Sequence, residues 1–179
     1  RFDGHDFAAD AFTAGAAAAV VERRPDTITG EAPLLEVKDT ARALEALGQA
    51  ARHRTGARVI AVTGSVGKTG TKEAIRFVLE EQGPTAASLC SLNNHWGVPL
   101  SLSRMPADSA FGVFEIGMNH PGEIAPLSRM VKPDVAVIIN VEGVHGAHFE
   151  SIEDIADAKA EIFEGMTGDG VAVLNRDNA

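Results

Sequence analysis

The chain has 179 residues, of which 45% are hydrophobic, and its formal net charge is -9 at pH 7. This acidic balance argues against a nucleic-acid backbone as the main partner, because neutralising phosphates requires clustered Lys and Arg side chains. The longest apolar stretch falls short of the roughly 20 residues that a membrane span needs, and a single cysteine, Cys90, excludes an internal disulfide. We therefore expect no nucleic acid, no membrane span and a cytoplasmic location.

The first 55 residues predict a small α/β piece and a helix that leads out of it. Residues 6–13 have the spacing of a short amphipathic helix, and residues 17–21 form an apolar run typical of a buried strand. A second helix is expected over residues 40–54, with Asp39 as its cap. Because the chain does not start with Met and its first helix has no strand before it to pack on, we expect further sequence upstream.

From residue 56 to residue 179, predicted strands and helices alternate. Strands are expected over residues 59–62, 85–89, 110–116, 135–140 and 171–174, and helices over residues 68–82, 121–130 and 151–166. This alternation is typical of a mostly parallel sheet flanked by helices. We predict a doubly wound α/β domain of the P-loop NTPase type over residues 56–179, incomplete at its C-terminal end. Residues 1–55 are then the remnant of a smaller α/β domain with a linker helix.

The most informative segment is residues 58–69, where an apolar strand leads directly into a glycine-containing loop and a helix. Backbone N–H groups at the start of a helix are unpaired and can bind phosphate oxygens, and the helix dipole favours the negative charge. Lys68 would reach the β- and γ-phosphates, and the Thr69 hydroxyl would ligate Mg²⁺. The predicted phosphate-binding loop consists of Thr63, Gly64, Ser65, Val66, Gly67, Lys68 and Thr69.

This loop departs from the usual pattern G-x-x-x-x-G-K-[ST] at one position, because Val62 stands where the first glycine would be. An ordinary strand-to-helix turn softened by glycine is therefore the alternative. The buried strand before the loop and the helical spacing of Ile75, Val78 and Leu79 after it favour phosphate binding.

Parallel α/β sheets bind ligands beyond the carboxyl ends of their strands, so the polar residues that follow each predicted strand are candidates for chemistry. Glu115 lies between Phe114 and Ile116 in an apolar strand, where an unpaired carboxylate is unfavourable. We predict that Glu115 helps to bind Mg²⁺, with exposure to water at the strand end as the alternative. After the next strand, His145 competes with His148 for a metal or phosphate role.

Lys159 lies in the middle of an apolar helix face. Its neighbours at helical spacing are residues 152, 155, 156, 162, 163 and 166, which read Ile, Ile, Ala, Ile, Phe and Met. One interpretation is snorkelling, in which the stem is buried and the ammonium reaches water. The functional interpretation is that burial lowers the pKa of Lys159 and makes its amine reactive or open to modification.

Four motifs occur in order along the chain. They are Thr-Gly-Ser-Val-Gly-Lys-Thr (63–69), Asn-Asn-His-Trp-Gly-Val-Pro-Leu (93–100), Glu-Ile-Gly-Met-Asn-His-Pro-Gly-Glu-Ile (115–124), and a segment (147–163) that starts Ala-His-Phe-Glu and ends Ile-Ala-Asp-Ala-Lys-Ala-Glu-Ile-Phe. Together they resemble the Mur ligases, and within that family the MurF type. The first residues, Arg-Phe-Asp-Gly-His-Asp-Phe (1–7), resemble the end of the N-terminal UDP-sugar-binding domain of the same family.

The resemblance implies an ATP-dependent ligase of peptidoglycan precursor synthesis, with UDP-N-acetylmuramoyl-tripeptide and D-alanyl-D-alanine as its small-molecule substrates. In this family ATP phosphorylates the terminal carboxylate of the substrate, and the incoming amine then displaces phosphate from the acyl phosphate. We expect a monomer. Most of the family's N-terminal domain and all of its C-terminal domain are missing from these residues, so we expect the fragment alone to be inactive.

The resemblance also implies roles for single residues. Lys68 holds the transferring phosphoryl group, Thr69 and Glu115 bind one Mg²⁺, and His148 binds a second. Lys159 matches the lysine that CO₂ carbamylates in this family, which places an anionic oxygen group beside the second Mg²⁺. Contacts with the nucleotide or acyl phosphate are implied for Asn94, and contacts with the nucleotide for Asn119 and His120.

Two other classes of protein stay open. A P-loop switch or motor ATPase would hydrolyse ATP to drive a conformational change without forming an amide. That class explains Lys68 and Thr69 but leaves the positions of Asn94, His148 and Lys159 unused. The second class is a non-catalytic nucleotide-binding module.

Overall fold

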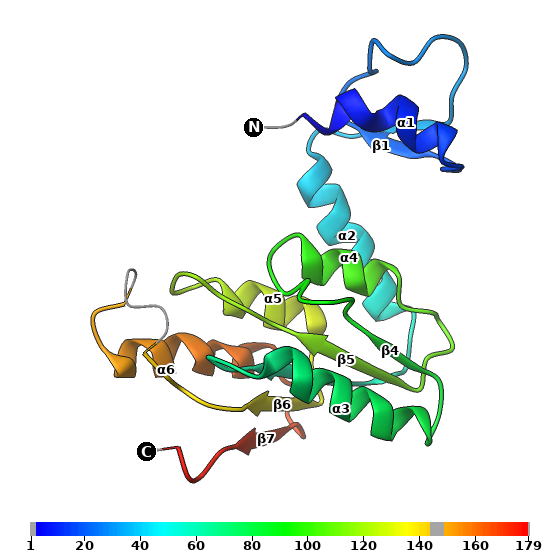
Figure 1. Ribbon diagram of the computed structural model, residues 1–179. Helices are drawn as coiled ribbons and strands as arrows, with labels where there is room; N and C mark the ends of the chain where they lie inside the picture. The colour runs from blue at the N-terminus through cyan, green and yellow to red at the C-terminus, as the bar shows by residue number, and fades with distance from the viewer. Residues whose placement is uncertain (1–2, 144–148, 179) are drawn as a thin grey trace. The chain divides into compact units, whose positions relative to one another are not determined.

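The computed structural model describes residues 3–143 and 149–178. It divides into two compact units, one up to Glu45 and one from Ala46, and the division falls within helix α2 (Thr40–His53; Figure 1). The assignment of residues 1–55 to a separate substrate-binding domain stays a prediction. None of the described helices is long and apolar enough to cross a membrane.

Helix α2 begins where the sequence predicts. The Asp39 carboxylate accepts a hydrogen bond from the backbone N–H of Arg42 at 2.9 Å. An acidic side chain in this position satisfies one of the unpaired donors of the first turn. The cap therefore determines the start of the helix locally.

The first unit contains a two-stranded parallel sheet and a short helical region. Its elements are the 3₁₀ helix η1 (Gly4–Phe7), α1 (Ala8–Thr13), β1 (Ala19–Val21) and β2 (Leu34–Glu36). Among its described hydrophobic residues, Ala8 and Val21 are buried, so its core is small. The sequence predicted the helix and β1 but missed β2, because a strand of three residues is too short to show an alternating pattern.

The second unit is built on a sheet whose five described strands lie in the order β4-β5-β3-β6-β7. The strands are β3 (Arg58–Thr63), β4 (Thr85–Ala87), β5 (Phe111–Glu115), β6 (Val135–Ile138) and β7 (Val171–Leu174). Each pairing between them is parallel, as the alternation of strands and helices indicated. Strand β3 therefore lies between β5 and β6, and this order decides which loops meet at the carboxyl edge.

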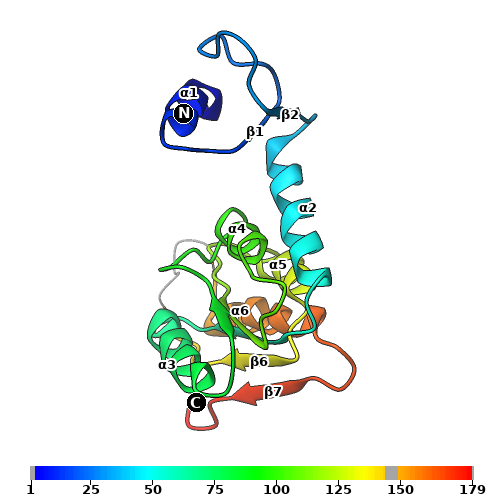
Figure 2. The same ribbon diagram turned by 90° about the vertical axis from the view of Figure 1, so that its right-hand side faces the viewer.

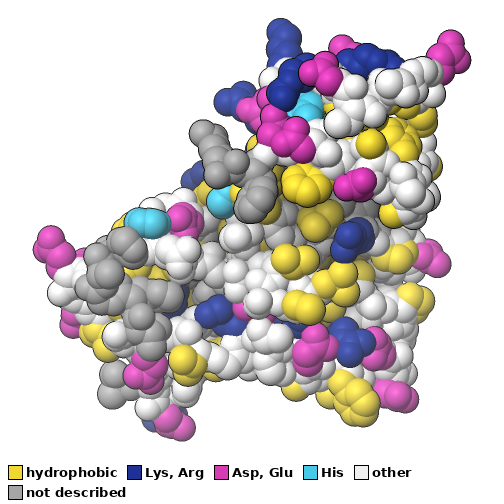
Figure 3. Space-filling model, turned by 45° about the horizontal axis from the view of Figure 1, so that its top comes forward, with side chains coloured by type: hydrophobic (Ala, Val, Ile, Leu, Met, Phe, Trp, Pro, Cys, Tyr) yellow, Lys and Arg dark blue, Asp and Glu magenta, His cyan; other side chains and the backbone are white. Residues whose placement is uncertain are grey.

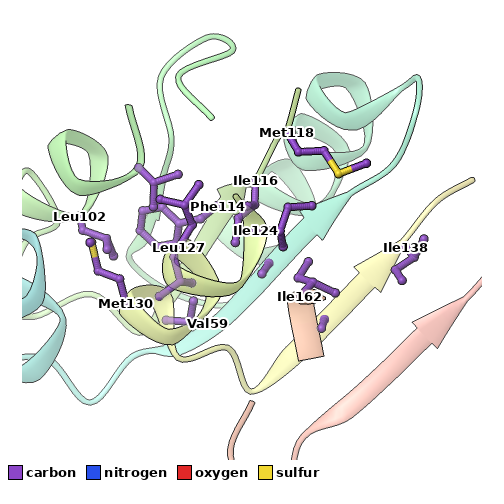
Figure 4. Close-up of a cluster of buried hydrophobic side chains, with 14 of the residues drawn as sticks. Val59, Leu102, Phe114, Ile116, Met118, Ile124, Leu127, Met130, Ile138 and Ile162 are labelled. Carbon is purple, nitrogen blue, oxygen red and sulfur yellow. The ribbon is translucent and has the colours of Figure 1, made fainter. Parts of the chain in front are cut away.

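Helices cover both faces of this sheet (Figure 2). On one face, α4 (Gly97–Ser103), α5 (Ile124–Val131) and α6 (Ile152–Ala160) pack against the larger apolar cluster. Figure 4 shows part of this cluster, with Val59 and Phe114 of the sheet close to residues of α5. Most of these side chains are almost completely removed from water, so this layer supplies most of the apolar burial in the unit.

The opposite face is covered by α3 (Lys68–Glu80). Ile75 and Leu79 of this helix pack against Ile60, Val62 and Val113 of the sheet. Because side chains alternate between faces along a strand, Glu115 lies on the same face as Val113, two residues earlier. The acid is therefore on the side of the sheet that carries α3.

The structure differs from the sequence prediction at three helices. The prediction missed α4, because its Gly-Val-Pro start reads as a turn, although proline is tolerated in the first turn of a helix. Helix α5 begins at Ile124 and not at Pro121, since Gly122 has φ +84 and interrupts the helical conformation. Helix α6 ends at Ala160 and continues as the 3₁₀ helix η2 (Glu161–Gly165).

The predicted start of α6 is confirmed. The Ser151 hydroxyl accepts a hydrogen bond from the backbone N–H of Asp154 at 3.1 Å, and the Asp154 carboxylate accepts one from the backbone N–H of Ser151 at 3.0 Å. This reciprocal pair is a capping box. It fixes the first turn of the helix that carries Lys159.

Candidate nucleotide and magnesium site

The register of the sheet brings three predicted site segments together. Val62 of β3 lies opposite Glu115 of β5, and Thr63 of β3 lies opposite Ile138 of β6. The loop after β3, the acid at the end of β5 and the polar residues after β6 therefore share one edge of the sheet. This edge is the one at which parallel α/β sheets bind ligands.

The loop after β3 is tied to the segment after β6. Asn140 Oδ1 accepts hydrogen bonds from the backbone N–H groups of Ser65 (2.9 Å) and Val66 (3.1 Å). The Ser65 hydroxyl donates to the carbonyl of Glu142 at 3.0 Å and accepts from its N–H at 2.8 Å. Gly67 has φ +81 and stands directly before α3, a backbone conformation that glycine adopts at little cost. The loop shape is thus fixed from both sides.

Lys68 lies at the start of α3 and curls back over the loop. Its Nζ donates to the carbonyl oxygens of Gly64 (2.7 Å) and Ser65 (3.3 Å). Burial lowers the pKa of Lys68, and the negative charge of Glu115 opposes that shift. The ammonium therefore lies close to the loop backbone and within the field of the acid.

Glu115 is 1% exposed, so the interpretation of a strand-end acid pointing to water is wrong. Thr69 Oγ1 donates to Glu115 Oε2 at 2.8 Å, and Asn93 Nδ2 donates to Glu115 Oε1 at 2.6 Å. The backbone N–H of Glu115 donates to the Ser88 hydroxyl at 3.2 Å. The buried carboxylate is held by neutral donors, which offset part of the free-energy cost of its burial.

The pair formed by Thr69 and Glu115 fits a magnesium ion. A hydroxyl oxygen and a carboxylate oxygen are hard ligands, and Mg²⁺ usually takes one or two protein ligands and completes its shell with water and substrate phosphates. Within residues 3–143 and 149–178, no group of three or more His, Cys, Asp or Glu side chains could hold a metal by itself. The donor set therefore suits a metal that arrives with a nucleotide.

Lys159 lies on α6, which packs on the face opposite to α3, and its side chain is 1% exposed. Burial is the main cause that lowers the pKa of Lys159 to about 8, and the positive charge of Lys68 contributes to the same shift. Among the described residues, no carboxylate or carbonyl accepts a hydrogen bond from Lys159 Nζ. Almost none of the residue is in contact with water, as snorkelling with a buried stem would also give, and no buried side-chain nitrogen or oxygen of the described residues is left without a partner. The two lysines are near enough for their charges to interact at the same edge.

Other predicted contacts lie on the loops around this edge. Asn94 Oδ1 accepts hydrogen bonds from the backbone N–H groups of Trp96 and Gly97 at the start of α4. The backbone N–H of Asn119 donates to a Glu123 carboxylate oxygen at 2.7 Å. The nucleotide contacts of these asparagines stay predictions.

The histidines of the predicted site are placed differently. His120 Nδ1 lies 3.0 Å from the carboxylate of Glu123, and the two side chains are exposed. His148 and its competitor His145 lie outside the described residues. In Figure 3, Asp and Glu side chains lie among the Lys and Arg side chains of the visible face, unlike the clustered basic surface that a nucleic-acid partner needs.

Sequence reasoning missed three polar residues that shape the site. Asn93 stands beside Asn94 in the same motif, and nothing local distinguishes which of the two meets Glu115. Asn140 comes after strand β6, and no sequence signal distinguishes it from an ordinary loop residue. Lys72 is 0% exposed and shares the face of Ile75 and Leu79 on α3, so the pattern that singled out Lys159 would also have found it.

Known proteins share both the sequence and the fold of this chain. The Mur ligase middle domain family matches residues 62–179. The UDP-N-acetylmuramoyl-tripeptide–D-alanyl-D-alanine ligase of Bacillus subtilis (strain 168) is 43% identical over 173 residues, which cover 97% of this chain and 38% of that protein.

Two solved structures extend the comparison. MurF from Acinetobacter baumannii superimposes with a TM-score of 0.86 and 38% identity, over 99% of this chain and 39% of its own. MurF ligase from Thermotoga maritima, solved in complex with ADP, has a TM-score of 0.83 and 33% identity, over 99% of this chain and 41% of its own.

This chain spans 38 to 41% of the length of these relatives. The matched family covers most of the second unit, from Val62 onward, and includes residues 63–69, Glu115 and Lys159. Sequence, parallel sheet and site geometry agree, and the chain belongs to the Mur ligase family.

Proposed function

We propose that this chain forms the nucleotide- and Mg²⁺-binding part of an ATP-dependent ligase that adds D-alanyl-D-alanine to UDP-N-acetylmuramoyl-tripeptide in peptidoglycan precursor synthesis. The observation that carries the proposal is the pairing of Thr69 with Glu115 beside two interacting lysines, Lys68 and Lys159. The name of the Bacillus subtilis relative supports the choice of substrates. Because this chain covers 38% of that relative, we propose the complete reaction for the full natural protein that carries these residues.

The loop of residues 63–69 would bind the nucleotide phosphates through its backbone N–H groups. Lys68, held over this loop by two carbonyl contacts, would turn to the phosphate oxygens, which are stronger acceptors than neutral carbonyls. Thr69 and Glu115 would hold one Mg²⁺, which neutralises charge on the β- and γ-phosphates when it is bound. The ADP complex of the Thermotoga maritima protein supports nucleotide binding.

The proposed reaction has two steps. An oxygen of the tripeptide's terminal carboxylate attacks the γ-phosphorus of ATP, the bond to the β,γ-bridging oxygen breaks, and ADP leaves. The amine of D-alanyl-D-alanine then attacks the carbonyl carbon of the acyl phosphate, phosphate leaves with the electrons of the carbon–oxygen bond, and the amine loses a proton. The Lys68 ammonium would stay in contact with the oxygens of the phosphoryl group during the transfer. Its contribution would therefore be to position this group and to neutralise its charge.

Lys159 would act as a carbamate. Its neutral amine attacks CO₂ and loses a proton, which leaves an anionic oxygen group on the nitrogen. Burial, the lowered pKa and the lack of a described acceptor for Nζ support this role, because carbamylation requires the neutral amine. We place a second Mg²⁺ beside this group, with His148 as its other ligand, and nucleotide or acyl-phosphate contacts at Asn94, Asn119 and His120.

We further propose that the full natural protein is a cytoplasmic monomer. The location rests on the use of ATP and on the single cysteine of the sequence, which suits a reducing compartment. Light scattering on the purified protein tests the oligomeric state, and a mass twice that of one chain would contradict it.

The decisive test of the function is phosphate release by the full natural protein with ATP and the UDP-linked tripeptide. We expect release to depend on D-alanyl-D-alanine. Phosphate release that is equal with and without D-alanyl-D-alanine would support a P-loop switch ATPase and not the ligase. A protein that binds ATP without any turnover would support the non-catalytic module.

Substitution of Lys159 sharpens this test. Lys159→Ala should abolish dipeptide-dependent release while thermal melting shows that the fold is kept, because the anionic group beside the second metal would be lost. Lys38→Ala is the matched control, since Lys38 is an exposed lysine of the first unit. Unimpaired release by Lys159→Ala would refute the role given to this residue.

A further inference from the structure

Lys72 is a buried lysine that the proposed reaction does not use. It lies on α3 and is 0% exposed. Its Nζ donates to the carbonyl oxygens of Ser88 (2.6 Å) and Cys90 (3.0 Å) and pairs with a Glu73 carboxylate oxygen at 2.8 Å. An ammonium has three N–H donors, so these contacts engage all of them. A group enclosed in this way has no donor left for a substrate.

The carbonyls that Lys72 binds belong to the segment of residues 88–93, which forms the first part of the connection between β4 and α4. This 88–93 segment contacts Glu115 at two points. The Ser88 hydroxyl accepts from the backbone N–H of Glu115, and Asn93 Nδ2 donates to its carboxylate. The carbonyl of Asn93 also accepts from the backbone N–H of Gly117 at 2.8 Å. The position of the carboxylate therefore depends on where this segment lies.

We propose that Lys72 is the positioning residue that holds Glu115 in register with Thr69. Thr69 and Lys72 are one turn apart on α3, so the helix that presents the hydroxyl also anchors the segment that orients the acid. This inference rests on the proposed function, in which Thr69 and Glu115 share one Mg²⁺. It concerns how this chain shapes the pair, and not which groups bind the metal.

The chemistry of the metal explains why this anchoring would matter. Mg²⁺ demands near-ideal octahedral geometry with ligands at about 2.0–2.1 Å, so a small shift of one ligand weakens binding. Loss of the Lys72 ammonium would leave the carbonyl oxygens of Ser88 and Cys90 without their donor, and the 88–93 segment would relax toward other partners. A residue that only filled space between α3 and β4 would not affect the metal in this way.

The experiment uses the full natural protein that carries these residues and compares the wild type with Lys72→Met, which keeps an unbranched apolar side chain and removes the N–H donors. Calorimetry measures the Kd of ADP with MgCl₂ and with EDTA. We expect the magnesium-free Kd to change less than about twofold, and the gain from Mg²⁺ to fall by about tenfold or more, as is common when a residue supporting a metal ligand is lost. Mn²⁺ in place of Mg²⁺ gives a spectroscopic readout, because the EPR spectrum reports bound metal directly.

Two further variants make the result specific. Glu73→Gln removes the ion pair of Lys72 and leaves its carbonyl contacts, so we expect it to bind Mg²⁺ and ADP like the wild type. Lys72→Arg keeps charged donors and should recover part of the metal dependence. If thermal melting shows that Lys72→Met does not fold, Asn93→Ala takes its place, since it removes the contact of the 88–93 segment with the carboxylate and should cause the same selective loss.

The outcomes separate the two proposals. A wild type that binds ADP equally with MgCl₂ and EDTA would overturn the metal site itself, and with it the inference. In the other case, the wild type binds ADP more tightly with Mg²⁺ than with EDTA. If Lys72→Met, or Asn93→Ala in its place, then shows the same Mg²⁺ dependence, the role of Lys72 alone is overturned. An equal loss in Glu73→Gln would overturn it too, because the charge and not the anchoring would then be responsible.

Discussion

At the scale of single residues, the site contains two buried ionisable side chains, Glu115 and Lys159. They differ in their hydrogen-bond partners. Glu115 receives hydrogen bonds from Thr69 and Asn93, so its burial is compensated. Lys159 receives no acceptor from the described residues and has its pKa lowered to about 8, burial being the main cause. Burial disfavours the charged form of an amine, and a lysine with a pKa shifted by its surroundings is a candidate for a functional role.

The lowered pKa of Lys159 predicts how the proposed carbamylation would depend on pH. At a pKa of about 8, about half of the amine is neutral at pH 8 and roughly a tenth at pH 7. Because the reaction of the neutral amine with CO₂ also releases a proton, the carbamate level at constant dissolved CO₂, far from saturation, should fall by more than about fivefold as the pH drops through that range. ¹³C NMR with labelled bicarbonate measures the carbamate signal.

A matched variant tests the assignment of that signal. Lys159→Arg keeps the positive charge and cannot form the carbamate, so the signal should be absent. A signal that persists in the variant, or one that grows as the pH falls from 8 to 7, would contradict the prediction.

At the scale of elements, Glu161 connects the end of α6 to the start of α5. Its Oε1 accepts from the backbone N–H of Gly122 at 2.6 Å, and its Oε2 accepts from those of Ile124 and Ala125, both at 3.0 Å. A carboxylate here satisfies unpaired donors at the helix start and interacts favourably with the helix dipole. Because Lys159 is two residues before Glu161, the same contact fixes the helix that presents the amine.

Glu161→Gln should therefore destabilise the chain by about 1–2 kcal/mol, since a neutral amide has one acceptor oxygen where the carboxylate has two. Urea unfolding measures the change in the free energy of unfolding. Glu164→Gln is the matched control on η2, because Glu164 pairs with Arg129 on the surface and such pairs contribute about 0–1 kcal/mol. Equal effects of the two variants would argue against the capping role.

The packing of η2 on α5 is close enough to exclude a methyl group. A Cβ on Gly165 would lie 2.0 Å from the carbonyl oxygen of Ser128, which is backbone and cannot move aside. We expect Gly165→Ala to cost about 3 kcal/mol or more, because overpacking of a buried contact forces the backbone to shift. At Gly168 a Cβ would meet nothing within 4 Å, so Gly168→Ala is the control in the same urea experiment. A stable Gly165→Ala variant would contradict this prediction.

At the scale of the whole molecule, the two units differ in how much apolar surface they bury. The first unit buries Ala8 and Val21 among its described hydrophobic residues, whereas the second unit contains the large cluster around β3, β5 and three helices. Small units bury too little surface to be very stable by themselves. We therefore expect unequal stability along the chain.

Hydrogen exchange checks this expectation. Backbone amides of β1 and β2 should exchange much faster than those of β3, β5 and β6, because the first unit opens at a lower free energy than the second. Equal protection of the two sets of strands would show that the units unfold as one and would contradict the prediction.

Much of the fold could be predicted because its signals are local. The apolar strand before residues 63–69, the capping box at Ser151 and the alternation of strands and helices each depend on neighbours within a few residues. The elements that were missed, β2 and α4, are short or start with turn-forming residues. Their local pattern is weaker than the packing that forms them.

The amino-acid sequence by itself determined the glycine-containing loop between β3 and α3, the apolar face that carries Lys159 and the class of the fold, because these depend on residue type at short spacing. Only the tertiary structure decided the strand order, the burial of Glu115 and the anchoring by Lys72. The bonds of Glu115 to Thr69 and Asn93 join positions 46 and 22 residues apart. No local pattern specifies such pairs, since they exist only after the sheet has brought its strand ends to one edge.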